Sequence, residues 1–190
     1  STSGVYIDGV EVLEGDYSGP SGARRAINDP DVQVAVVETA RGGILLRGLA
    51  CESNDVSVFT NVSGDHLNLH GVLTVEGLAE VKAVVVRTTR SGGTAVLNAD
   101  DPLVIDSTRD IRAEKLYFTC EPDNRVVALH LAAGGKVLAL EDNAIVVRAS
   151  ASTAPIAPLS AVPMTFDGRA SHMVANAMAA AGAAIGLGLS

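Results

Sequence analysis

Residues 56–67 read VSVFTNVSGDHL, an apolar run that passes directly into a polar one. The run Val56–Phe59 is typical of a buried parallel strand, and so is Val34–Val37, which leads into Glu38. In open α/β sheets the ligand crevice lies outside the carboxyl ends of the strands. We therefore expect Glu38 and the pair Asp65-His66 to lie at the same rim of one parallel sheet.

Strand patterns alternate with helix patterns along most of the chain, which predicts an α/β fold. We expect a mostly parallel sheet flanked by helices, with a small antiparallel meander. The expected strands lie at 34–37, 56–60, 94–97, 115–119 and 162–166, with a hairpin at 5–13, the meander at 126–148 and a connector at 150–158. The expected helices lie at 20–28, 42–49, 74–90 and 171–187, with a short one that begins at Pro102.

The composition indicates one domain with a core of aliphatic side chains. The 190 residues are 47% hydrophobic and contain no Trp, and their net charge of −8 disfavours nucleic acid as the main partner. Cys51 and Cys120 form no CxxC pair, so we expect two buried free thiols in a reducing cytosol, although a single disulfide stays open. No signal peptide is apparent, and the Ala-rich tract Met173–Leu189 is too short to span a membrane. We expect a cytoplasmic protein with no membrane partner.

Lys82 is unusual because its neighbours on the expected helix, Leu78 and Val85, are apolar. One interpretation is that its methylene groups are buried and its ammonium reaches water. The other is that burial removes the proton, because a desolvated ammonium is costly. A neutral lysine can add carbon dioxide, and the carbamate would be an anionic oxygen ligand for Mg²⁺. The spacing leaves both interpretations open.

Glu38 and His66 are candidate metal ligands. A hard divalent cation prefers oxygen ligands, which favours Glu38. His66 fits a mixed site that holds Mg²⁺ or Mn²⁺, and a purely structural role is its alternative. The nearby His70 is expected at the surface.

Residues 98–102 read NADDP and follow another expected strand. Turn and helix-cap chemistry is sufficient to explain them. Their position at the rim also allows Asn98 or Asp101 to contact a nucleotide. Asn176 lies within an Ala/Met-rich helix, where it is either a buried, hydrogen-bonded residue or a contact to a purine edge.

Two expected helix starts are candidate substrate-binding segments. Thr39 and Arg41 precede Gly42-Gly43, where main-chain amides can hold an anion and the arginine can clamp a carboxylate or phosphate. Ser21 and Arg24 occupy a similar position at the earlier helix. The 190 residues contain no GxxxxGK[ST] phosphate loop.

Together these features resemble the central, ATP-binding domain of the Mur ligase family. The strand end at Glu38, the run from Asn61 to Leu67, Lys82, the NADDP run and Asn176 with Ala180 occur in the order found in that family. Within the family, the cyanophycin synthetase group is the most similar. The runs that carry this similarity are GVYIDG at 4–9, GPSGARR at 19–25, ETARGGIL at 38–45, VKAVV at 81–85 and AVLNADDP at 95–102.

The resemblance implies ATP-dependent amide formation, in which a substrate carboxylate takes the γ-phosphoryl group and an amine attacks the acyl phosphate. It implies that Glu38 and His66 ligate Mg²⁺, that a carbamylated Lys82 helps to hold a second Mg²⁺, and that Asn176 faces adenine. The substrates would be an amino acid and a peptide or polymer. In the cyanophycin synthetase group, arginine is joined to aspartate side chains of the polymer.

The resemblance also implies that the family's phosphate-loop segment and C-terminal domain lie outside these residues. We therefore expect a part of a larger ligase that is inactive alone. Asn68 stands where cell-wall Mur ligases commonly have Asp. Another Mur-type ligase, acting on cell-wall peptides or polyglutamate, is one alternative, and a non-catalytic binding module is another. A homo-oligomer is compatible with each of these.

Overall fold

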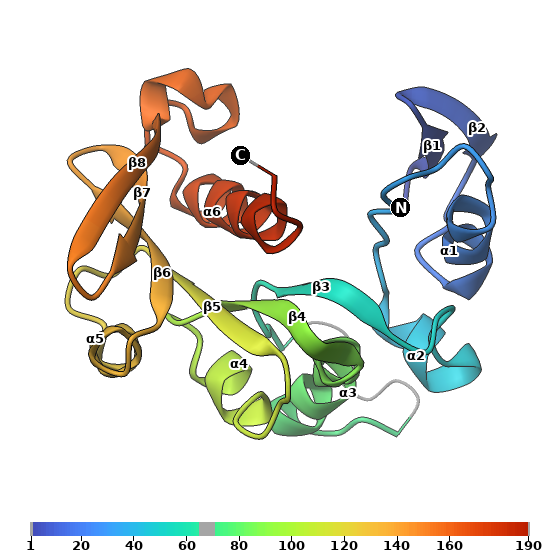
Figure 1. The fold of residues 1–190 in the computed structure, drawn as a ribbon. Coiled ribbons are helices and arrows are strands. Elements are labelled where there is room, and N and C mark those ends of the chain that lie inside the picture. Colours follow the sequence, from blue (N-terminus) through green and yellow to red (C-terminus); the bar gives the residue numbers. More distant parts are fainter. Residues whose placement is uncertain (1, 65–70, 190) are drawn as a thin grey trace.

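A six-stranded sheet forms the centre of the protein (Figure 1). The computed structural model describes residues 2–64 and 71–189. The strand order is β3-β4-β5-β6-β7-β8; β3 to β6 are parallel, and β7 and β8 continue the sheet antiparallel. The strands are β3 (Asn54–Phe59), β4 (Thr89–Asn98), β5 (Glu114–Thr119), β6 (Lys136–Glu141), β7 (Ala144–Ala149) and β8 (Ser152–Pro158). The predicted mostly parallel α/β sheet is confirmed.

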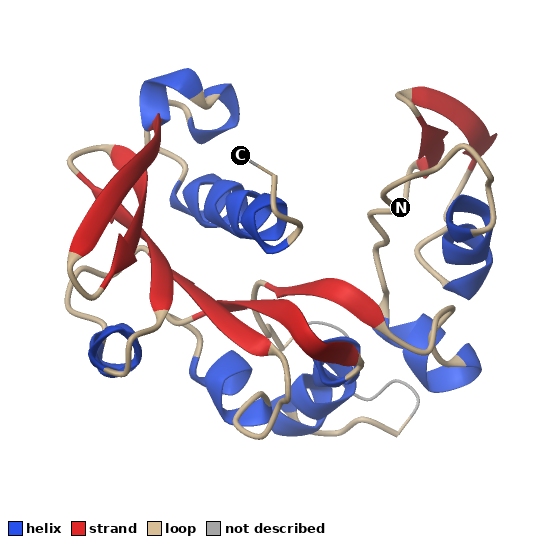
Figure 2. Cartoon of the chain, in the orientation of Figure 1, coloured by secondary structure: helices blue, strands red, loops and turns tan. Residues whose placement is uncertain are grey.

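Helices cover both faces of this sheet (Figure 2). One face carries α6 (Ser171–Gly186), and the other carries α3 (Val75–Arg87), α4 (Pro102–Ser107) and α5 (Arg125–Ala132). Successive residues of β4 point to opposite faces, so Leu97 joins the core beneath α3 and Val96 joins the core beneath α6. Thr74 accepts a hydrogen bond from the Gly77 N–H and caps α3, as the sequence predicts.

Helix α6 packs closely on the sheet because a glycine faces β4. A Cβ atom at Gly182 would lie 2.6 Å from Val96 Cγ1, so no larger residue fits without a shift. Gly186, one turn later, lies over Thr94, two residues before Val96 in β4, and over Val56, its partner in β3. The helix therefore runs antiparallel to these strands, and its N-terminal half lies toward their carboxyl ends.

The N-terminal residues form a small unit on the β3 side of the sheet (Figure 1). The predicted hairpin is present: β1 (Gly4–Ile7) and β2 (Val10–Glu14) turn at Asp8 and Gly9, whose φ angles of 48° and 78° are those of a type I′ turn. Helix α1 (Pro20–Ile27) follows, and α2 (Arg41–Arg47) leads toward β3.

The predicted buried strand at Val34–Val37 is wrong. These residues are irregular, and Val36 is 93% exposed. A strand needs a hydrogen-bonded partner, and among the described residues none pairs with this segment. The apolar residues of this segment are compatible with a strand. However, the local sequence does not show whether another strand lies beside it to pair with.

The region after β5 also differs from expectation. Residues 125–132, predicted as the start of a meander, form α5, because Asn124 accepts hydrogen bonds from the Val126 and Val127 N–H groups and caps a helix. The run at 152–158, predicted as a connector, is the edge strand β8, where proline is tolerated. Residues 162–166 form no strand; they follow the 3₁₀ turn η1 (Leu159–Ala161) and include η2 (Pro163–Thr165).

The helix expected at 74–90 ends at Arg87, and Gly92 and Gly93 lie within β4. Both cysteines are free, as predicted, but neither is buried: Cys51 is exposed and Cys120 is half-buried. Among the described helices, none combines the length and the apolar character needed to cross a bilayer.

His130 is the least well satisfied polar side chain of the α5 face. Its Nε2 atom is buried and has no hydrogen-bond partner among the described residues. The ring packs edge-on against Tyr117, with 4.9 Å between ring centroids, and a Cβ atom at Gly135 would clash with it. Burial lowers the pKa of His130; main-chain hydrogen bonds at Lys115 and Lys136 oppose this shift in part, and the Lys115 ammonium adds a smaller lowering. The folded protein therefore favours the neutral imidazole.

This predicts a loss of stability in mild acid. The unfolded chain takes up the proton first, so the contribution of His130 is complete above its unfolded pKa of about 6.5 and declines as the pH falls below it. We expect the free energy of unfolding, measured by urea denaturation, to fall less steeply between pH 7.5 and 5.5 in His130→Phe than in the wild type. His172→Gln, which changes an exposed histidine, is the control. Parallel curves for wild type and His130→Phe would contradict this assignment.

Candidate functional site

The carboxyl ends of β3 and β4 meet in a network of side-chain hydrogen bonds. Residues 60–62, here named the strand-end loop, follow β3 directly. Asn98 Nδ2 donates to the Thr60 carbonyl oxygen at 2.7 Å, and Lys82 Nζ donates to the Asn61 carbonyl oxygen at 3.3 Å. The Val62 N–H donates to Asp101 Oδ2 at 2.7 Å. The structure thus brings together Lys82, Asn98 and Asp101, three of the residues predicted from the sequence.

Asp100 and Asp101 confirm the turn-and-cap interpretation of the NADDP run. Asp101 Oδ1 accepts from the Leu103 and Val104 N–H groups and caps α4. Asp100 bonds to three groups near the end of β5: the Thr119 hydroxyl, the Cys120 N–H and Asn124 Nδ2. Two adjacent carboxylates therefore connect the ends of β3, β4 and β5 with the starts of α4 and α5.

Sequence reasoning missed Asp100 and Asn124 as members of this network. Asn124 could have been found as a cap, because an Asn directly before an apolar run is a helix-start signal. The contact between Asp100 and Asn124 carries no such local signal, because the two residues lie 24 positions apart.

The carboxylate of Asp100 also affects a neighbouring thiol. Partial burial, with Asp100 and Glu121 close by, raises the pKa of the Cys120 thiol to about 11. Negative neighbours disfavour the thiolate, so this cysteine is a weak nucleophile near neutral pH.

A cavity of about 650 Å³ lies beside this network. It opens between the starts of α4 and α5, and its lining includes Asp100, Pro102, Arg109, Asn124 and Arg125. Its volume is in the range of small-molecule pockets, and it lies outside the carboxyl ends of β4 and β5, where open α/β sheets bind ligands.

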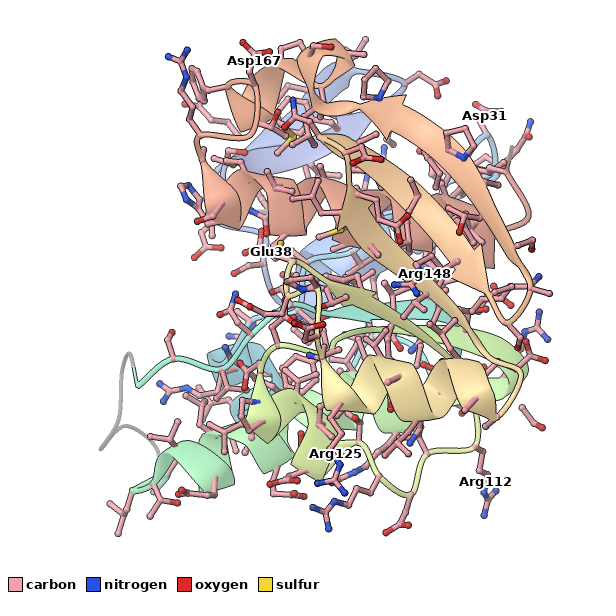
Figure 3. The ribbon with its side chains drawn as sticks, turned by 90° about the vertical axis from the view of Figure 1, so that its left-hand side faces the viewer. Asp31, Glu38, Arg112, Arg125, Arg148 and Asp167 are labelled. Atoms are coloured by element: carbon pink, nitrogen blue, oxygen red, sulfur yellow. The ribbon has the colours of Figure 1, made fainter. Side chains whose placement is uncertain are left out.

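The structure places two of the three predicted metal ligands, Glu38 and Lys82. Glu38 is exposed, and its Oε2 atom accepts a hydrogen bond from the Thr2 N–H at 3.1 Å, whereas the half-buried Lys82 bonds to Asn61. Figure 3 shows Glu38 apart from Arg125, which marks the start of α5. His66 lies outside the described residues. Within 2–64 and 71–189, no three His, Cys, Asp or Glu side chains are grouped to hold a metal ion.

The two predicted substrate-binding segments lie side by side. The Ala40 N–H donates to the Ser18 carbonyl oxygen at 2.9 Å, and a Cβ atom at Gly43 would lie 3.4 Å from Gly19 Cα. The starts of α1 and α2 are therefore in contact. Ser21 and Arg24 are exposed, and Thr39 and Arg41 are half-buried.

Asn176 is exposed on α6, so its predicted alternative as a buried, hydrogen-bonded residue is wrong. The one hydrogen bond found for it is a long one, from Nδ2 to Met173 Sδ at 4.0 Å. Its amide is thus available at the surface, on the helix half that lies toward the carboxyl ends of the strands.

Residues 21–184 match the family described as the Mur ligase middle domain. The chain belongs to the Mur ligase family. Its relatives include the cyanophycin synthetases of Synechocystis sp., 42% identical over 100% of this chain, and of Crocosphaera subtropica, 43% identical over 95%. The chain spans 22% and 21% of the length of these two relatives. A UDP-N-acetylmuramoylalanine–D-glutamate ligase of Geobacillus kaustophilus is 38% identical over 34% of the chain and 14% of its own length.

The contrast between the two cysteines predicts selective alkylation. At pH 8 a pKa of about 11 leaves Cys120 about 100-fold less thiolate than the reference pKa of 9.0 would. We expect iodoacetamide, followed by mass spectrometry, to label the exposed Cys51 at least tenfold faster than Cys120. Asp100→Asn should speed the labelling of Cys120, because it removes a negative charge beside the thiol. Asp106→Asn, at an exposed carboxylate of α4, is the control. Equal labelling of both wild-type cysteines would contradict the raised pKa.

Proposed function

We propose that this chain is the central part of an ATP-dependent ligase that forms amide bonds, of the cyanophycin synthetase type. The observation that carries the proposal is the identity of about 42% with cyanophycin synthetase over the whole chain, against partial coverage by cell-wall ligases. In this reaction a substrate carboxylate oxygen attacks the γ-phosphorus of ATP, and ADP leaves. The amine of arginine then attacks the acyl carbon, inorganic phosphate leaves with one former carboxylate oxygen, and the nitrogen loses a proton.

Nucleotide binding is proposed at the rim of the sheet. The cavity beside Asp100 is lined by Arg109 and Arg125, but also by the carboxylates of Asp100, Asp106, Glu121 and Asp123. Arg109 pairs with Asp106 at 2.6 Å, so the charge of the cavity does not by itself favour an anion. The exposed amide of Asn176 is proposed to face the adenine. Asn98 and Asp101, which were also predicted to contact the nucleotide, already use their polar atoms in hydrogen bonds within the protein.

Arg41, Thr39, Ser21 and Arg24 are proposed to bind the anionic groups of the substrates. Support comes from the contact between the starts of α1 and α2, which places these segments on one surface. A guanidinium can pair with a carboxylate through two parallel hydrogen bonds, and the same fork neutralises phosphate charge. In this role the arginines hold the reacting groups without taking part in bond formation.

Mur ligases generally use ATP and Mg²⁺, and we propose the same requirement for this protein. A metal site formed by Glu38, His66 and Lys82 requires Glu38 to lie beside the end of β3. The outer edge of β3 has no strand partner in the described part of the chain, and no main-chain pairing engages residues 33–39 there. The proposed metal site therefore needs an arrangement of residues 33–39 that differs from the one in this structure.

Isotope transfer provides the test of the proposed reaction. We expect the protein that carries this chain to join arginine to an aspartate polymer only when ATP and magnesium are present. Oxygen-18 placed in the polymer carboxylates should appear in the released phosphate, as an acyl phosphate requires. Glutamate with a UDP-linked alanyl acceptor is the control substrate pair for a cell-wall ligase. Turnover of that pair alone would favour the second candidate, and nucleotide binding without any ligation would favour a binding module.

Residues 1–190 alone should not hydrolyse ATP, because they contain no GxxxxGK[ST] loop to hold the β- and γ-phosphates. The measurement is phosphate release by the purified 190-residue chain, with and without magnesium. The longer protein serves as the positive control. Magnesium-dependent turnover by the 190 residues would show that another phosphate-binding arrangement operates.

A further inference from the structure

Asp101 bonds with both carboxylate oxygens, and the two oxygens serve different elements. Oδ1 accepts from the Leu103 and Val104 N–H groups at 2.9 and 3.4 Å, which is the cap of α4. Oδ2 accepts from the Val62 N–H at 2.7 Å, across 39 positions of sequence. A cap alone needs one oxygen, so the second bond is a separate feature of the site.

The second oxygen acts on the strand-end loop, residues 60–62, which begins where the pairing of β3 with β4 ends at Phe59. The strand-end loop is instead held by Asn98 at Thr60, by Lys82 at Asn61 and by Asp101 at Val62. Each of its three residues is bound by a different side chain, two of them from the NADDP run and one from α3.

The bond to Val62 has the properties of a strong anchor. Val62 is 9% exposed, and a short bond from an N–H to a carboxylate is stronger than one between neutral groups. The neighbouring Asn98 is itself oriented, because its Oδ1 atom accepts from the Asp100 N–H at 2.9 Å. The loop therefore takes its position from the NADDP run, which ends the adjacent strand.

These contacts argue against direct nucleotide binding by Asp101. Both of its oxygens face main-chain donors, and a carboxylate repels phosphate. We infer that Asp101 is a positioning residue: through Val62 it holds the strand-end loop, and with it the carbonyl acceptor of Lys82, in the arrangement that the ligase site uses. The effect on catalysis rests on the proposed function, whereas the effect on the loop does not.

Asp101→Asn separates the two roles. Asparagine caps helices as well as aspartate does, so its Oδ1 atom keeps the bonds to Leu103 and Val104. Its Nδ2 group is a donor and cannot accept from the Val62 N–H. Asp101→Ala loses both bonds, and Asp106→Asn, at an exposed carboxylate of the same helix, is the matched control.

Amide hydrogen exchange followed by NMR measures the effect on the loop. In Asp101→Asn we expect the Val62 amide to exchange at least tenfold faster, with the Leu103 and Val104 amides within threefold of wild type. In Asp101→Ala all three amides should exchange faster, and in Asp106→Asn none should. An unchanged Val62 amide in Asp101→Asn overturns the inference.

Steady-state kinetics of the protein that carries this chain measure the effect on catalysis. We expect Asp101→Asn to lower kcat about tenfold and to leave KM for ATP within twofold of wild type. A tenfold rise in KM for ATP with an unchanged kcat would identify a nucleotide ligand instead and would overturn the positioning role. If the wild-type protein forms no amide bond, the proposed function fails, and the exchange experiment still decides whether Asp101 holds the loop.

Discussion

The hydrogen bonds accepted by Asp100 and Asp101 are the constraint on which the rim of the sheet depends. A β-ladder stops at the end of each strand and leaves main-chain groups there without ladder partners. The two carboxylates accept from such groups after β3, at Val62, and after β5, at Cys120. Asp101 caps α4 directly, and Asp100 bonds to Asn124, which caps α5. One pair of adjacent residues therefore sets the relative positions of three strand ends and two helices.

These carboxylates can act in this way because β4 is held firmly between two apolar layers. Val96 and Leu97 are fully buried on opposite faces, the first beneath α6 and the second beneath α3. The close contact at Gly182 lets α6 lie directly on the sheet. Burial of aliphatic side chains supplies the main stabilisation of such a layer, and the polar groups at its end then specify one geometry.

The expectations from sequence were accurate where an element depends on residues close in the chain. They were less accurate where it depends on residues that are distant in the chain. The hairpin at 5–13 and the helices at 74–90 and 171–187 depend mainly on neighbouring residues, and all three are confirmed. The helix α5 was missed because an apolar run without strict periodicity is compatible with either a strand or a helix. The edge strand β8 was missed because its prolines resemble a connector, although an edge position tolerates them. For the candidate site, the rim position of Asn98 and Asp101 was predicted, whereas their bonding partners were not.

The sequence by itself determined the elements that depend on local contacts: turns with left-handed residues, helix caps and the alternation of apolar runs that indicates a parallel sheet. It also carried the family, because residue order along the chain is sufficient for that comparison. Only the tertiary structure decided that Val34–Val37 lacks a strand partner among the described residues and that Asn176 is exposed. It alone joined Asp101 to Val62 across 39 positions. The physical reason is that strand pairing, burial and long-range hydrogen bonds each depend on a second group, whose position the local sequence does not specify.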